Sequence, residues 1–130
     1  MNRSPVLGRG GAVAASQPLA AQAGLDALRD GGSAADAACA AAITLGVVEP
    51  MSCGLGGDLF ALVWNERGKQ LSALNASGHS PSSATIDSYG ERSVRGEIPL
   101  DSPLAVTVPG ALRGFETLLQ HFGRLGWSAA

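Results

Sequence analysis

Hydrophobic residues recur at helical spacing near the start of the chain. After Ser16, a residue type that favours the position before a helix, apolar side chains repeat every three or four residues, at Pro18, Ala21, Leu25 and Leu28. Gly31-Gly32 follows, and glycine commonly ends a helix. The pattern therefore predicts a helix of about three turns.

A second helix is predicted directly after the first. Ser33 and Asp36 form a capping-box pattern, with aspartate in place of the more common glutamate. Alanine-rich apolar sequence then continues to Val48, and Pro50 stops it. Because this helix is apolar on all sides, we expect it to be buried, with its alanines allowing neighbouring backbones to come close.

Strands are predicted where short apolar runs are bounded by turn residues. Residues 59–64 (LFALVW) and 70–75 predict a hairpin joined by the polar turn 65–69. The runs GAVAA at 11–15 and LAVTV at 104–108 predict two further short strands.

The remaining residues predict a loop region and a final helix. Residues 76–87 are rich in serine and proline and predict a loop, and residues 88–102 have no clear period. Pro109 then opens an amphipathic helix that ends near Gly123, with apolar positions at Leu112, Phe115, Leu119 and Phe122. Alternating helices and strands indicate an α/β fold, and we interpret residues 1–130 as one incomplete domain.

Composition excludes several classes of protein. Hydrophobic residues make up 45% of the chain, which excludes a disordered protein, and charged residues make up only 15%. The net charge of −2 and scattered basic residues argue against a nucleic-acid partner. The longest apolar stretch, 37–48, is too short for a membrane span, and the first sixteen residues lack a signal-peptide pattern, so we expect a cytoplasmic location.

The candidate chemistry from single residues is sparse. The loop Gly54-Leu55-Gly56-Gly57 follows a helix and precedes a strand, which is the reverse of a nucleotide-binding glycine loop. The adjacent Asp58 is either an acid or ligand, or a brace for the loop. Cys39 and Cys53 are expected as free, packed thiols, and with His79 and His121 they do not form a metal-site pattern, so no cofactor is predicted. We expect His121 to be a solvated helical residue, whereas His79 is more open to a functional role.

Three stretches together resemble the γ-glutamyltransferases, also called γ-glutamyltranspeptidases or glutathione hydrolases. Residues 13–64 (VAASQPLAAQAGLDALRDGGSAADAACAAAITLGVVEPMSCGLGGDLFALVW) resemble the opening of that family in order and spacing. Residues 74–81 (LNASGHSP) and 104–127 (LAVTVPGALRGFETLLQHFGRLGW) are similar to two later family segments. The resemblance covers nearly the whole chain from Gly11 onward.

Membership of this family implies an N-terminal-nucleophile hydrolase fold, an α-β-β-α sandwich. It implies a precursor that cleaves itself into a large and a small subunit, exposing a threonine whose own α-amino group serves as the base for its hydroxyl. On this resemblance the chain is the N-terminal part of the large subunit, and the threonine and the oxyanion donors lie outside it. The implied partners are a γ-glutamyl or related acyl amide, the rest of the large subunit and the small subunit.

The resemblance also indicates a substrate-binding position in this chain. Relatives carry an arginine in a segment such as R-E-T-A-P or S-G-R-A-P, where a guanidinium binds the substrate carboxylate through two parallel hydrogen bonds. Those two positions fall here on Ser77 and His79. Because neither is arginine, acylase-like substrates other than γ-glutamyl compounds become plausible. The alternative interpretation is a non-catalytic truncated or interaction fragment.

Overall fold

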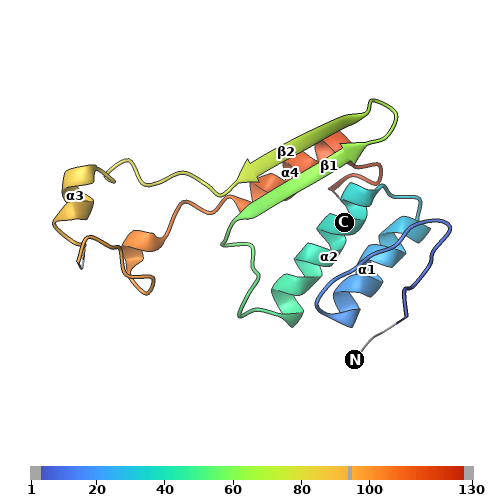
Figure 1. The fold of residues 1–130 in the computed structure, drawn as a ribbon, viewed down its shortest axis with the longest axis horizontal. Coiled ribbons are helices and arrows are strands. Elements are labelled where there is room, and N and C mark those ends of the chain that lie inside the picture. Colours follow the sequence, from blue (N-terminus) through green and yellow to red (C-terminus); the bar gives the residue numbers. More distant parts are fainter. Residues whose placement is uncertain (1–3, 94, 128–130) are drawn as a thin grey trace.

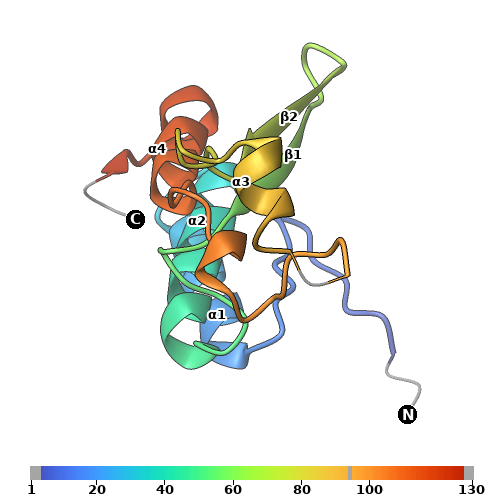
Figure 2. The same cartoon turned by 90° about the vertical axis from the view of Figure 1, so that its left-hand side faces the viewer.

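The chain folds into helices that pack on a single β-hairpin. The computed structural model describes residues 4–93 and 95–127. In chain order its elements are α1 (Pro18–Arg29), α2 (Ala34–Val48), β1 (Leu59–Asn65), β2 (Gln70–Ala76), α3 (Ile86–Gly90), the short 3-10 helix η1 (Pro103–Ala105) and α4 (Ala111–Phe122). α1 lies beside α2, α4 packs behind the hairpin, and the segment with α3 projects to one side (Figure 1). Figure 2 shows α1, α2 and α4 following one another beside the hairpin.

The core forms where α4 meets both α2 and the hairpin. Its buried members come from all three places and are Cys39, Leu59, Ala111, Phe115, Leu118 and Leu119. The predicted amphipathic helix is thus confirmed, although Leu112 is exposed and Leu118 takes a place in the buried face. Burying a side chain such as Phe115 stabilises the fold by about 1.5–3 kcal/mol. α4 therefore holds the helical layer and the hairpin together.

The two faces of the hairpin differ in burial. The predicted hairpin is confirmed, and each strand is one residue longer than predicted: β1 and β2 pair antiparallel with Leu59 opposite Ala76 and Asn65 opposite Gln70. Because side chains alternate along a strand, Leu59 and its neighbours on one face point to α4. The other face is apolar but uncovered, with Phe60, Leu62 and Trp64 exposed by 66%, 73% and 55%.

The prediction for α2 is right for its start and only partly right for its burial. The capping box is present, since the Ser33 hydroxyl accepts from the backbone N–H groups of Ala35 and Asp36, and the Asp36 carboxylate accepts from the Ser33 N–H at 2.7 Å. One side of the helix is buried, but Val47 is 78% exposed. No helix in the described part of the chain is long and apolar enough to cross a membrane.

Asp36 also ties α2 to the segment that follows α4. Its side chain, 1% exposed, accepts hydrogen bonds from the backbone N–H groups of Arg124 at 2.8 Å and Leu125 at 3.3 Å. Burial opposes ionisation, but the hydrogen bonds from Ser33, Arg124 and Leu125 outweigh it and hold the pKa of Asp36 below its ordinary value. The residue that caps α2 therefore also connects distant parts of the chain.

Two predicted strands are absent from the described residues. Residues 11–15 form no strand, since the sheet in the part of the chain that the structure describes consists of β1 and β2. Residues 104–108 begin in η1, where the Ser102 hydroxyl accepts from the Leu104 N–H. Apolar β-type sequence needs a neighbouring strand to form a ladder, and neither segment has one here.

Two local assignments also need correction. Ser16 does not cap α1, since the helix starts after Gln17 and the Ser16 hydroxyl donates to Glu49 at the end of α2. α3 lies across the boundary between the predicted loop and the unassigned region. Its N-cap is Thr85, whose side chain accepts from the Ser88 N–H in a capping box that the hydrophobic pattern does not reveal.

We predict that Asp36→Asn lowers the free energy of unfolding by about 2–3 kcal/mol, because an amide group would face N–H donors that a carboxylate satisfies. Since the folded state lowers the pKa of Asp36, the stabilisation is present above the ordinary aspartate pKa and is lost as the pH falls through the folded value. Urea denaturation should show that the difference in the free energy of unfolding between the two proteins shrinks as the pH falls below about 4. The control is Asp101→Asn, at an exposed position. Equal stability at pH 7 would contradict the role of Asp36.

Candidate functional site

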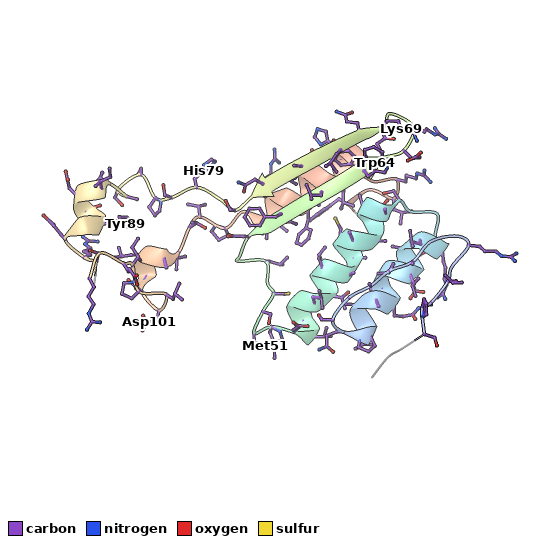
Figure 3. All side chains as sticks on the ribbon, in the orientation of Figure 1. Met51, Trp64, Lys69, His79, Tyr89 and Asp101 are labelled. Carbon is purple, nitrogen blue, oxygen red and sulfur yellow. The ribbon has the colours of Figure 1, made fainter. Side chains whose placement is uncertain are left out.

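The two candidate substrate-binding residues lie where the chain leaves β2. Ser77 directly follows the strand and is half-buried, and its backbone N–H donates to Asn75 Oδ1 at 3.0 Å. His79 is exposed and lies between the hairpin and the segment that carries α3 (Figure 3). The hairpin therefore fixes the start of this loop, and two residues later the chain is at the surface.

A second segment, residues 107–110, runs against this loop. The Val108 N–H donates to the His79 carbonyl at 2.9 Å, and the Thr107 hydroxyl donates to the Ser77 carbonyl at 2.9 Å. These bonds join residues about thirty positions apart in the chain. They hold Ser77 and His79 beside the start of α4.

Two glycines allow this close approach. Gly78 has φ +82°, and a Cβ there would lie 1.7 Å from the Val108 carbonyl oxygen. A Cβ at Gly110 would lie 2.3 Å from the Ala76 carbonyl oxygen and 2.6 Å from the Gly78 nitrogen. Because backbone atoms stand on both sides, no side chain of any size fits in the crossing.

A cavity of about 520 Å³ lies beside the crossing. The loop contributes Ser77 and His79 to its wall, and α4 contributes Arg113 and Thr117. No aspartate or glutamate is among its lining residues. The cavity thus combines hydroxyl groups with two side chains that can carry positive charge.

Arg113 is a charged residue in this wall that the sequence did not indicate as functional. It lies in the first turn of α4, 76% of its side chain is exposed, and it pairs with Glu116 one turn further along. Its approach to Ser77 and His79 depends on the crossing of two distant segments. The sequence offers only a weak signal for it, namely an arginine three residues after a glycine that opens a helix.

The glycine loop before β1 has a structural role. The Gly57 carbonyl accepts from the backbone N–H groups of Gly110 at 3.2 Å and Ala111 at 3.0 Å. It therefore satisfies donors at the start of α4 that a helix by itself leaves unpaired. Asp58 is exposed and lines a separate cavity of about 270 Å³ together with Cys53.

The remaining candidate groups do not add to the site. Both cysteines are free, as expected, and Cys39 is buried in the core. Burial, and then the charge of Asp36, raise the pKa of Cys39 to about 11, so its thiol stays protonated at neutral pH and is a poor nucleophile. His121 is exposed on α4, as predicted, with Nδ1 2.9 Å from the Thr117 carbonyl oxygen.

Comparison with known proteins identifies the family. Residues 20–130 match the family described as gamma-glutamyltranspeptidase. The chain belongs to the γ-glutamyltranspeptidase family. Among its relatives, the glutathione hydrolase-like YwrD proenzyme of Bacillus subtilis is 40% identical over 125 residues, which are 96% of this chain and 23% of that protein. The resemblance that the three sequence stretches indicated is confirmed.

Solved structures agree with this family assignment. The γ-glutamyltranspeptidase of Helicobacter pylori superimposes with a TM-score of 0.80 at 31% identity, over 93% of this chain and 35% of its own. The cephalosporin acylase of Bacillus halodurans does so with a TM-score of 0.79 at 42% identity, over 98% of this chain and 25% of its own. The predicted fold class, part of an N-terminal-nucleophile hydrolase, is confirmed. The chain spans about a fifth to a quarter of the length of the curated relatives that it matches.

We predict that Gly110→Ala destabilises the protein by about 1–3 kcal/mol, because the new methyl group collides with backbone atoms that cannot move aside. Gly56→Ala is the matched control, since a Cβ at Gly56 has nothing within 4 Å. Thermal unfolding of both variants measures the difference. A Gly110→Ala protein as stable as Gly56→Ala would show that the crossing is not tight in solution.

Proposed function

We propose that residues 1–130 are the N-terminal segment of the large subunit of an enzyme that hydrolyses or transfers γ-glutamyl or related acyl amides. The observation that carries this proposal is the family match over residues 20–130. Relatives named as glutathione hydrolases and as a cephalosporin acylase both support an amide substrate. The chain's own part in this reaction is to form one wall of the substrate pocket and one side of the scaffold.

The chemistry in this proposal starts from a threonine outside residues 1–130. After cleavage of the precursor, the threonine hydroxyl oxygen attacks the amide carbonyl carbon while the α-amino group of the same threonine takes the hydroxyl proton. The C–N bond then breaks, and the proton leaves with the amine. Water or an amino acid finally takes the acyl group, which restores the free threonine. On its own the 130-residue chain is therefore expected to be inactive.

The substrate pocket is proposed to include Ser77 and His79. Relatives place an arginine at one of these positions, and a guanidinium binds a carboxylate through two charge-assisted hydrogen bonds. A serine retains at most one ordinary hydrogen bond. We therefore propose that ordinary γ-glutamyl compounds are poor substrates and that other acyl amides are accepted.

The uncovered face of the hairpin is proposed to contact the rest of the enzyme. Phe60, Leu62 and Trp64 share one face of β1, Leu71 lies opposite Trp64 on β2, and all four are more than half exposed. Exposed apolar patches of this kind usually mark an interaction surface. The remainder of the large subunit and the small subunit are its proposed occupants. The cytoplasmic location stays a prediction, which cell fractionation would test.

We predict that the full-length protein splits into two polypeptides, and that the smaller one begins with threonine. Replacing this threonine with alanine should stop both the cleavage and the turnover of a panel of acyl anilides, because the hydroxyl group is the nucleophile in each case. Gel electrophoresis, N-terminal sequencing and a chromogenic assay measure the three outcomes. An uncleaved protein that turns over no amide would favour a non-catalytic role instead.

We further predict that His79→Arg or Ser77→Arg raises kcat/KM for glutathione by about tenfold to a hundredfold, because the guanidinium restores a charge-assisted contact to the carboxylate. A valeryl anilide, which carries no carboxylate, should gain nothing. Ser82→Arg, at an exposed position in the same loop region, controls for added charge. If the unmodified enzyme already prefers glutathione strongly and neither arginine improves it, the carboxylate is held elsewhere.

A further inference from the structure

Residues 80–106 form an arm that projects from the Gly78–Gly110 crossing, away from the helices and the hairpin (Figure 1). The bonds from Val108 to the His79 carbonyl and from Thr107 to the Ser77 carbonyl hold its two ends together. Within the described residues, the extensive contacts between elements join α1, α2, α4 and the hairpin, and none of them involves α3 or η1. The arm therefore receives little support from the rest of the described chain.

The arm nevertheless has a defined internal structure. The capping box of Thr85 and Ser88 starts α3, and the Tyr89 hydroxyl donates to the Leu104 carbonyl at 3.1 Å. This bond joins α3 to η1, and Tyr89 lies between the two in Figure 3. However, α3 has only five residues, and neither α3 nor η1 has a buried residue. Because helices this short are marginal in water by themselves, the arm needs a further contact to support it.

An apolar groove of about 600 Å³ lies between α3 and η1. Its walls include Ile86 from α3, Leu104 from η1 and Leu100 from the chain between them. Ile86 is 91% exposed and Leu100 is 97% exposed. The charged residues of the arm all lie outside the groove lining. Large exposed apolar side chains with no charged residue among them are typical of the centre of a protein–protein interface.

The groove adjoins the proposed substrate pocket. Ser80 and Thr107 line the groove, and their chain neighbours His79 and Val108 line the cavity beside the crossing. Thr107 is also bonded to Ser77, which lines that cavity. The proposed nucleophile is a threonine that begins the small subunit, and it must reach an acyl group held in this cavity. The small subunit therefore has to pass beside the groove.

We propose that the groove of the arm is a docking surface for the small subunit, which places apolar side chains between α3 and η1. This inference rests on the proposed function, because that function supplies a small subunit whose first residue lies at the pocket. These residues match only about a fifth to a quarter of the curated relatives. A full-length protein of this family therefore has ample further chain to fill the groove and to support the arm.

The first test measures how far the groove is covered in the full-length protein. Leu100→Cys is combined with Cys53→Ser, which removes the partly exposed native thiol, whereas Cys39 is buried and stays protonated. Its reaction with a maleimide should be at least about tenfold slower in the native protein than in urea. Arg92→Cys in the same background, at an exposed position outside the groove, should react at similar rates in both. Equal rates for Leu100→Cys would overturn the inference, and so would protection that is lost on dilution, because a second copy would then cover the groove.

The second test identifies the occupant. The photoreactive residue benzoylphenylalanine replaces Ile86 in one full-length variant and Leu100 in another, and mass spectrometry locates the cross-linked peptide. Cross-links to the small subunit support the inference, and replacement of Arg92 should give none. Cross-links only to the large subunit or to a second copy, or none from either position, would overturn it.

The same two measurements separate this inference from the proposed function, because neither requires turnover. A protein that is neither cleaved nor active, but whose groove is protected and cross-links to the part of the chain after residue 130, would reject the proposed reaction and support the docking surface. A cleaved and active protein whose Leu100→Cys thiol reacts as fast as in urea would support the reaction and reject the docking surface.

Discussion

The backbone crossing between residues 75–79 and 107–110 is the constraint on which the rest of the structure depends. It brings the end of the hairpin against the start of α4, and it closes the segment containing α3 into a projecting loop. The Gly57 carbonyl accepts hydrogen bonds from the same end of α4. With its first turn held in this way, α4 can place Phe115 and Leu119 between α2 and the hairpin. The same crossing shapes the cavity, so the fold and the proposed site share one cause.

The packing of the chain is uneven, and this has a physical consequence. One face of the hairpin covers α4, while the other face leaves large apolar side chains in contact with water. Small residues dominate α2, so this helix packs closely against its neighbours but buries little area for each residue. Hydrophobic stabilisation is therefore incomplete within these residues, which fits a segment that matches only part of each relative.

Local signals in the sequence predicted the elements that depend on neighbouring residues. The capping box at Ser33 and Asp36, the stop at Pro50 and the hairpin are all decided within a few positions of the chain. The strand predictions for residues 11–15 and 104–108 were wrong because an apolar run carries no information on whether a partner strand lies beside it. α3 was missed because its start depends on a polar capping box and its five residues are too few to show a hydrophobic period.

The sequence by itself determined the family and the amphipathic face of α4, and its resemblance to the family predicts Ser77 and His79 as substrate-binding positions. Motifs carry that information because they lie within continuous stretches of chain. Only the tertiary structure decided that Arg113 shares a cavity with those residues and that Asp36 binds the segment after α4. These contacts join residues from about thirty to ninety positions apart. They arise from glycine crossings and buried hydrogen bonds, which leave no periodic pattern in a sequence.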